Sequence, residues 1–137
     1  MATRARIGIQ NDDGTIRSVY HHWDGYPEWL GKTLRQHFDT VDKVNTLIDG
    51  GDMSSCRTNV GFNNETRETT GPLYYSERGE TTPAKVNSSF ELYMGNNNAL
   101  EEFYYLFLNN EWKCYFLRGE MTGEPLYIEQ VIPEGDL

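Results

Sequence analysis

Residues 103–117 constrain the fold of this chain more than any other segment. Phe103 to Leu108 is apolar or aromatic at every position, which is typical of a strand that is buried on both faces. Asn109-Asn110 favours a tight turn, and Trp112 to Leu117 supplies the return strand. The sequence therefore predicts a central β-hairpin, with one face against helices. The other face needs further chain or a partner over it.

A second hairpin is predicted near the N-terminus. Apolar and polar residues alternate from Ala5 to Gln10, as they do in a strand with one buried face. Asp13-Gly14 favours a hairpin turn, because both residues tolerate a positive φ. Residues 16–23 then form the return strand. Two further strands are expected, one over 90–94 and one over 125–132, although the second segment also suits a short helix.

Two consecutive helices are predicted after the first hairpin. Leucine and phenylalanine recur at four-residue spacing in residues 27–38, and Pro27 suits the first turn of a helix. Thr40 is a candidate N-cap for a second helix over 41–49. Asp24 is expected to cap the first helix, with its neighbouring rings packed on the core. These elements predict an α+β fold, in which a mainly antiparallel sheet of about four to six strands carries two helices on one face.

The length of 137 residues fits a single domain over residues 1–137. Residues 52–89 are polar, and within them only Leu73 to Tyr75 has the pattern of a strand. A loop of that length is unusual in a compact domain, so the segment is expected to be either a functional loop or partly ordered.

Composition and charge exclude several classes of protein. The chain carries nine Tyr, six Phe and three Trp, which a disordered acidic tail would not. Its net charge of −9 argues against non-specific nucleic-acid binding. No apolar run is long enough to span a membrane. Two cysteines and an N-terminus without an apolar signal region indicate reduced thiols in the cytosol.

The segment from Tyr20 to Pro27 is the densest patch of chemically active side chains. It contains His21, His22 and Asp24, which could move a proton or bind a metal. However, neighbouring residues of a strand point to opposite faces, so the two imidazoles are not expected to share one ligand. Gly25 to Thr33 departs from the spacing of a phosphate-binding loop. We therefore expect no metal site, no cofactor and no catalytic residue, and favour a binding protein over an enzyme.

The stretch from Arg4 to Pro27, which ends in His-Trp-Asp-Gly-Tyr-Pro, resembles a group of small proteins of tailed phages and prophages that share this box. His21 stands where Cys is more often expected in that group. The resemblance implies a phage origin and a setting in the host cytoplasm, and it carries no activity. Later landmarks that look similar are Gly50 to Ser55, Tyr75 to Glu80 and Glu102 to Phe107.

Three functions remain open from the sequence. The first is a non-enzymatic phage protein that binds and neutralises a host factor, as an anti-defence or host-takeover inhibitor. The second is a sponge that sequesters a small nucleotide signal, and the third is a small enzyme using His21 or His22 with Asp24. Self-association as a homo-oligomer is also left open. The predicted binding residues are Trp23, Tyr26, Arg57, Tyr75, Arg78 and Trp112.

Overall fold

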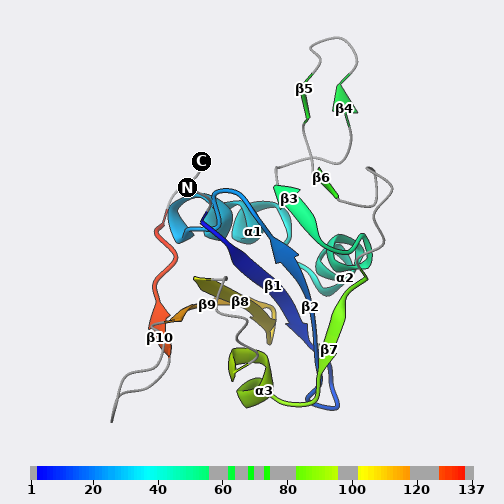
Figure 1. The fold of residues 1–137 in the computed structure, drawn as a ribbon, viewed down its shortest axis with the longest axis vertical. Helices are drawn as coiled ribbons and strands as arrows, with labels where there is room; N and C mark the ends of the chain where they lie inside the picture. Colours follow the sequence, from blue (N-terminus) through cyan, green and yellow to red (C-terminus); the bar gives the residue numbers. More distant parts are fainter. Residues whose placement is uncertain are drawn as a thin grey trace.

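The structure is a computed structural model, and within its described residues the chain forms a mixed β-sheet with helices packed on both faces (Figure 1). The described residues are 3–55, 62–63, 68–69, 73–74, 83–95, 102–117 and 127–134.

Eight strands form the main sheet in the described part of the chain. Seven of them follow the spatial order β10-β9-β8-β1-β2-β3-β6, and β7 pairs with the part of β2 that β3 does not contact. Five of the seven strand pairs are antiparallel, whereas β1–β8 and β2–β3 are parallel. The strands are β1 (Ala5–Gln10), β2 (Ile16–His21), β3 (Met53–Ser55), β6 (Leu73–Tyr74), β7 (Lys85–Asn87), β8 (Phe103–Leu108), β9 (Glu111–Leu117) and β10 (Tyr127–Gln130), and β4 (Phe62–Asn63) pairs separately with β5 (Glu68–Thr69).

The predicted fold class is confirmed. The sheet is mainly antiparallel, and five of its strands are four or more residues long. The two predicted helical segments are also present: residues 27–38 contain η1 (Pro27–Gly31), a π-helical turn, followed by α1 (Lys32–His37), and α2 spans Val41–Asp49. The side chain of Thr40 caps α2 as predicted, because its Oγ1 accepts a hydrogen bond from the backbone N of Lys43 at 3.2 Å.

The helices α1 and α2 cover one face of the sheet, which we call the helix face. Ile7 and Ile9 of β1 point to this face, where they pack with Leu34 of α1 and Leu47 of α2. Tyr105, the cross-strand neighbour of Ile7 on β8, is completely buried in the same cluster. Residues far apart in the sequence therefore build one apolar core here.

The opposite face is partly covered by α3 (Phe90–Gly95), which corrects the prediction of a strand over 90–94. Tyr93 and Met94 are adjacent in sequence, and both are buried against Tyr104 and Leu106 of β8. Adjacent side chains on a helix can both face the sheet, whereas adjacent side chains on a strand point to opposite faces, so a strand would turn one of the two away from β8. Both faces of the central β8 strand are thus buried, as the apolar run predicts.

The outer edge of β2 is shared by two short strands that lie within the polar segment. Residues 16–18 of β2 pair with β7, and His21 pairs with Met53 of β3. Between them, the carboxylate of Asp52 accepts a hydrogen bond from the backbone N of Tyr20 at 2.8 Å. The expectation that only 73–75 forms a strand within 52–89 is therefore wrong, because β3 and β7 are ordered by pairing with β2.

Among the described residues, no helix is long and apolar enough to cross a membrane.

Candidate binding surface at the end of β2

The loop that follows β2 is held to the sheet at Gly25. The backbone N of Gly25 donates to the carbonyl of Thr3 at 2.8 Å, and its own carbonyl accepts from the hydroxyl of Tyr105 at 2.7 Å. The backbone around Gly25 lies so close to the backbone of Thr3 that a Cβ at position 25 would be 2.6 Å from the Thr3 carbonyl oxygen. Glycine is therefore required at this position by space, and the loop is clamped from two sides.

The clamp corrects the expectation that Asp24 caps the first helix. Tyr26 is the residue that precedes η1, and no side chain caps that helical turn. Asp24 is exposed and adopts a left-handed backbone conformation with φ 57°. The residue therefore serves to reverse the chain between β2 and the clamp.

Trp23 projects from this loop, with 49% of its surface exposed, so the expectation that it packs on the core is wrong. Its indole meets the His22 imidazole edge to face, with ring centroids 4.7 Å apart. The Nδ1 atom of His22 is 2.7 Å from the hydroxyl of Tyr20. Three rings are thus held in contact on the face of the sheet opposite α1 and α2. Together with Arg4 they form what we call the Trp23 surface.

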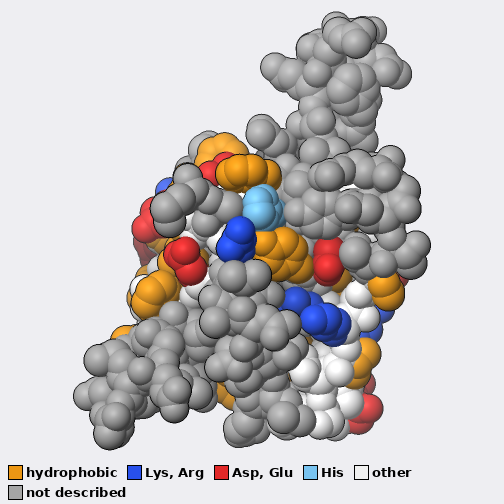
Figure 2. All heavy atoms as spheres, viewed as in Figure 1, with side chains coloured by type: hydrophobic (Ala, Val, Ile, Leu, Met, Phe, Trp, Pro, Cys, Tyr) orange, Lys and Arg blue, Asp and Glu red, His pale blue; other side chains and the backbone are white. Residues whose placement is uncertain are grey.

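Arg4 brings a positive charge to the Trp23 surface. The atom Nε of its guanidinium is buried and has no hydrogen-bond partner among the described residues. Burial and the nearby charge of Arg4 both lower the pKa of His22 below its ordinary value. Figure 2 shows a histidine among hydrophobic side chains, with a basic side chain beside it, on this face of the molecule. The arrangement offers flat rings and one cation to a ligand.

His21, by contrast, lies on the helix face and is completely buried. Burial, together with the charge of His22, lowers the pKa of His21 to about 3. The two imidazoles therefore occupy different environments, as the strand geometry predicts. Among the described residues, no group of three His, Cys, Asp or Glu side chains is arranged to hold a metal ion.

The structure does not gather the predicted binding residues into one place. Trp23 and Tyr26 lie on the same clamped loop. Trp112 pairs with Phe107 of β8, four residues beyond Phe103, which pairs with Ala5. Its indole donates to the carbonyl of Phe38 at 2.7 Å. Trp112 thus ties β9 to the end of α1. Arg57, Tyr75 and Arg78 lie outside the described residues.

Sequence reasoning missed Arg4 and Tyr20 as members of this surface. Arg4 precedes an alternating strand, and such a polar position is ordinarily solvent-facing. Tyr20 has the aromatic character of a core residue. The alternation of the strand could have predicted that Tyr20 lies beside His22, because residues two positions apart in a strand share a face.

A comparison of the chain with protein-family models, with curated proteins and with solved structures finds no match.

Proposed function

We propose that this chain is a non-enzymatic phage protein that binds and neutralises a host factor through the Trp23 surface. The observation that carries the proposal is an exposed tryptophan on a loop clamped at Gly25. Aromatic residues of this kind dominate the binding energy of many protein interfaces. A clamped loop loses little conformational entropy when a partner binds, which favours affinity.

The chemistry of the described residues supports binding rather than catalysis. His21 is buried, with a pKa near 3, so it remains neutral and out of reach of a substrate. Burial raises the pKa of the Cys114 thiol to about 12, which leaves almost no thiolate to act as a nucleophile at neutral pH. Neither side chain is placed for acid–base or covalent chemistry.

A small nucleotide is the second candidate ligand, and Arg4 is the observation that favours it. A nucleotide needs a flat ring for its base and a cation for its phosphate, and Trp23 and Arg4 supply these two groups. Burial and Arg4 lower the pKa of the neighbouring His22, and a bound anion would oppose this shift, so nucleotide binding should strengthen as the pH is lowered.

The test compares wild type with Trp23→Ala and with Val131→Ala. Val131 is 85% exposed and follows β10, at the opposite edge of the sheet, so it is a matched apolar control. Each protein is mixed with bacterial lysate, recovered and analysed by native mass spectrometry. We expect one stoichiometric host protein with wild type and Val131→Ala, and its loss with Trp23→Ala.

The same experiment separates the two candidate ligands. A bound nucleotide that is lost in Arg4→Gln, in place of a protein, would favour the sponge. Equal recovery of the same partner by all variants would contradict a role for the Trp23 surface.

A further inference from the structure

The side chain of Tyr105 joins the buried core to the loop that carries Trp23. Tyr105 lies in β8, within the main sheet, and its side chain is completely buried on the helix face. Its hydroxyl donates to the carbonyl of Gly25 at 2.7 Å. Because a ring in a closely packed core has little freedom to move, the sheet holds this donor in a fixed position.

Few other bonds hold the backbone of the loop. In the part of the chain that the structure describes, the backbone hydrogen bonds of residues 22–25 are those of Gly25, one with Thr3 and one with Tyr105. Gly25 is itself buried. If the Tyr105 hydroxyl were removed, the Gly25 carbonyl would be left buried without a partner, which is unfavourable in the closed loop.

Cys114 of β9 lies beneath the same part of the chain. It is the cross-strand neighbour of Tyr105 and is completely buried. Burial raises the pKa of the Tyr105 hydroxyl, and the adjacent Cys114 thiol raises it further. The charge of Glu28 in η1 adds to the effect of burial on the Cys114 thiol, and η1 lies against β9. Residues 22–31 therefore cover this thiol.

The end of η1 also packs on Tyr105. A Cβ added at Gly31 would lie 3.5 Å from Cε1 of the Tyr105 ring. One side chain thus contacts the segment 22–31 at two places, through its hydroxyl at Gly25 and through its ring at Gly31. The segment is expected to move as one unit when these contacts are lost.

We propose that the hydrogen bond from Tyr105 to Gly25 controls a local opening of residues 22–31, which removes Trp23 from its surface and exposes Cys114. Tyr105 lies on the other face of the sheet from the Trp23 surface, so it acts as a positioning residue and not as a contact for a partner. The link to binding rests on the function proposed above, whereas the opening itself is a property of the chain alone.

The test measures the opening with two probes in the full chain. The first is the rate at which iodoacetamide alkylates Cys114, followed by mass spectrometry in a Cys56→Ser background that leaves one thiol. The second is hydrogen exchange of the Gly25 amide, followed by nuclear magnetic resonance. In wild type, both rates should depend only weakly on urea at low concentration, because the opening of one loop exposes little surface.

Tyr105→Phe should raise both rates about tenfold, which corresponds to the loss of one buried hydrogen bond. The matched control is Tyr93→Phe. Tyr93 is also completely buried, and its hydroxyl donates to a backbone carbonyl, that of Tyr105, at 2.8 Å. This bond joins α3 and not the loop to the sheet, so Tyr93→Phe should leave both rates as they are in wild type.

Two results would overturn the proposal. Equal acceleration in Tyr105→Phe and Tyr93→Phe, or wild-type rates that follow the urea dependence of global unfolding, would show that both probes report unfolding of the whole domain. Acceleration of only one probe in Tyr105→Phe would show that residues 22–31 do not open as one unit. The wild-type urea dependence decides the question even where a variant does not fold.

The link to binding has a separate outcome. A partner that binds only the closed loop makes opening rarer, by a factor set by its concentration relative to its Kd. A partner that wild type captures and Trp23→Ala does not should therefore slow both rates. Unchanged rates with that partner would contradict the link, whereas failure to capture any partner would contradict the proposed function alone.

Discussion

The two faces of the sheet use adjacent histidines in different ways at the end of β2. On the helix face, His21 is completely buried, and its pKa lies near 3. On the opposite face, His22 is only half-buried and contacts an exposed tryptophan. We therefore expect the stability of the domain to depend on His21 and the proposed binding to depend on the side of the segment that carries His22 and Trp23. Substitutions at His21 and His22 should therefore affect stability to different extents.

The largest expected effect is a loss of stability in acid. The unfolded chain binds a proton at a histidine near pH 6.5, whereas native His21 does so only near pH 3. The free energy of unfolding should therefore fall by about 1.4 kcal/mol for each unit below pH 6.5, or about 3 kcal/mol by pH 4. Urea unfolding at several pH values measures this slope.

The variants His21→Leu and His22→Leu separate the contributions of the two faces. His21→Leu removes the titrating group and should flatten the slope, whatever it does to the stability at neutral pH. His22→Leu should leave most of the slope in place, because His22 is far less buried. Identical slopes in wild type and His21→Leu would show that another group controls the acid response.

The next largest effect is expected at Gly25, the glycine at which the loop after β2 is clamped to the sheet. A methyl group at this position meets the Thr3 carbonyl and the Ala5 side chain, so Gly25→Ala should cost about 2 kcal/mol. The comparison is Gly14→Ala, where no atom lies within 4 Å of the added Cβ but φ is +88°. That variant should cost about 1 kcal/mol. A smaller loss for Gly25→Ala than for Gly14→Ala, by chemical denaturation, would argue against the clamp.

The smallest effect is expected at Asp24, on the exposed side. Alanine tolerates the left-handed conformation less well than aspartate, so Asp24→Ala should cost about 1 kcal/mol. Asp24→Gly should be as stable as wild type, or slightly more stable. Thermal melts of both variants measure this, and a large loss in Asp24→Gly would point to a side-chain interaction.

Local patterns predicted much of the fold. Thr40 caps α2, and alternation from Ala5 to Gln10 placed β1 correctly. The helix α3 was missed because the burial of Tyr93 and Met94 is decided by contacts with β8, which no local pattern records. The pairing of β1 with β8 is likewise non-local.

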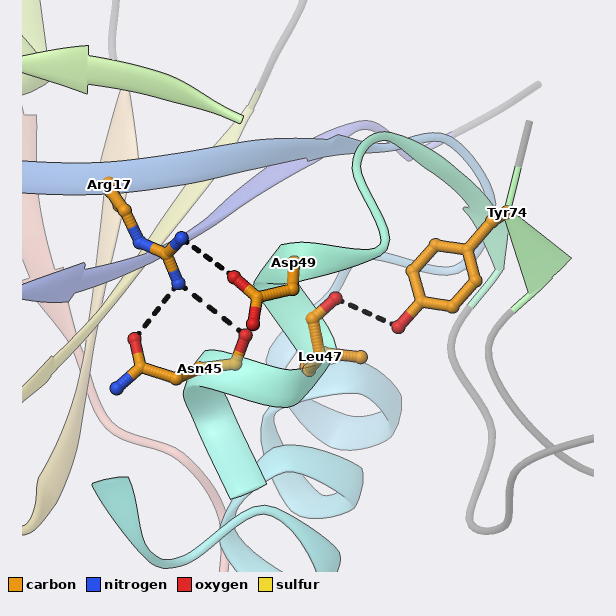
Figure 3. Close-up of polar contacts among 5 residues, drawn as sticks. All are labelled: Arg17, Asn45, Leu47, Asp49 and Tyr74. Atoms are coloured by element: carbon orange, nitrogen blue, oxygen red, sulfur yellow. Dashed lines mark hydrogen bonds and ion pairs between the residues drawn. The ribbon is translucent and has the colours of Figure 1, made fainter. Parts of the chain in front are cut away.

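The candidate sites were harder to predict than the fold. The loop that carries Trp23 is clamped at Gly25, and that clamp depends on Tyr105, which is eighty positions away in the sequence. Likewise, Arg17 of β2 binds Asn45 and Asp49 of α2, which are 28 and 32 positions away in the sequence (Figure 3). Such contacts join residues whose spacing carries no signal, so sequence patterns alone indicate the chemistry present and not its arrangement.

The parallel pairing of β1 with β8 has a consequence for how the chain is made. Ala5 pairs with Phe103, about a hundred residues later, so the centre of the sheet cannot close until most of the chain has left the ribosome. Until then, the β1–β2 hairpin displays an unpaired apolar edge, which is the kind of surface that promotes aggregation during synthesis. Folding of this domain should therefore be late and slow, and its yield should depend on chaperones and on the rate of translation.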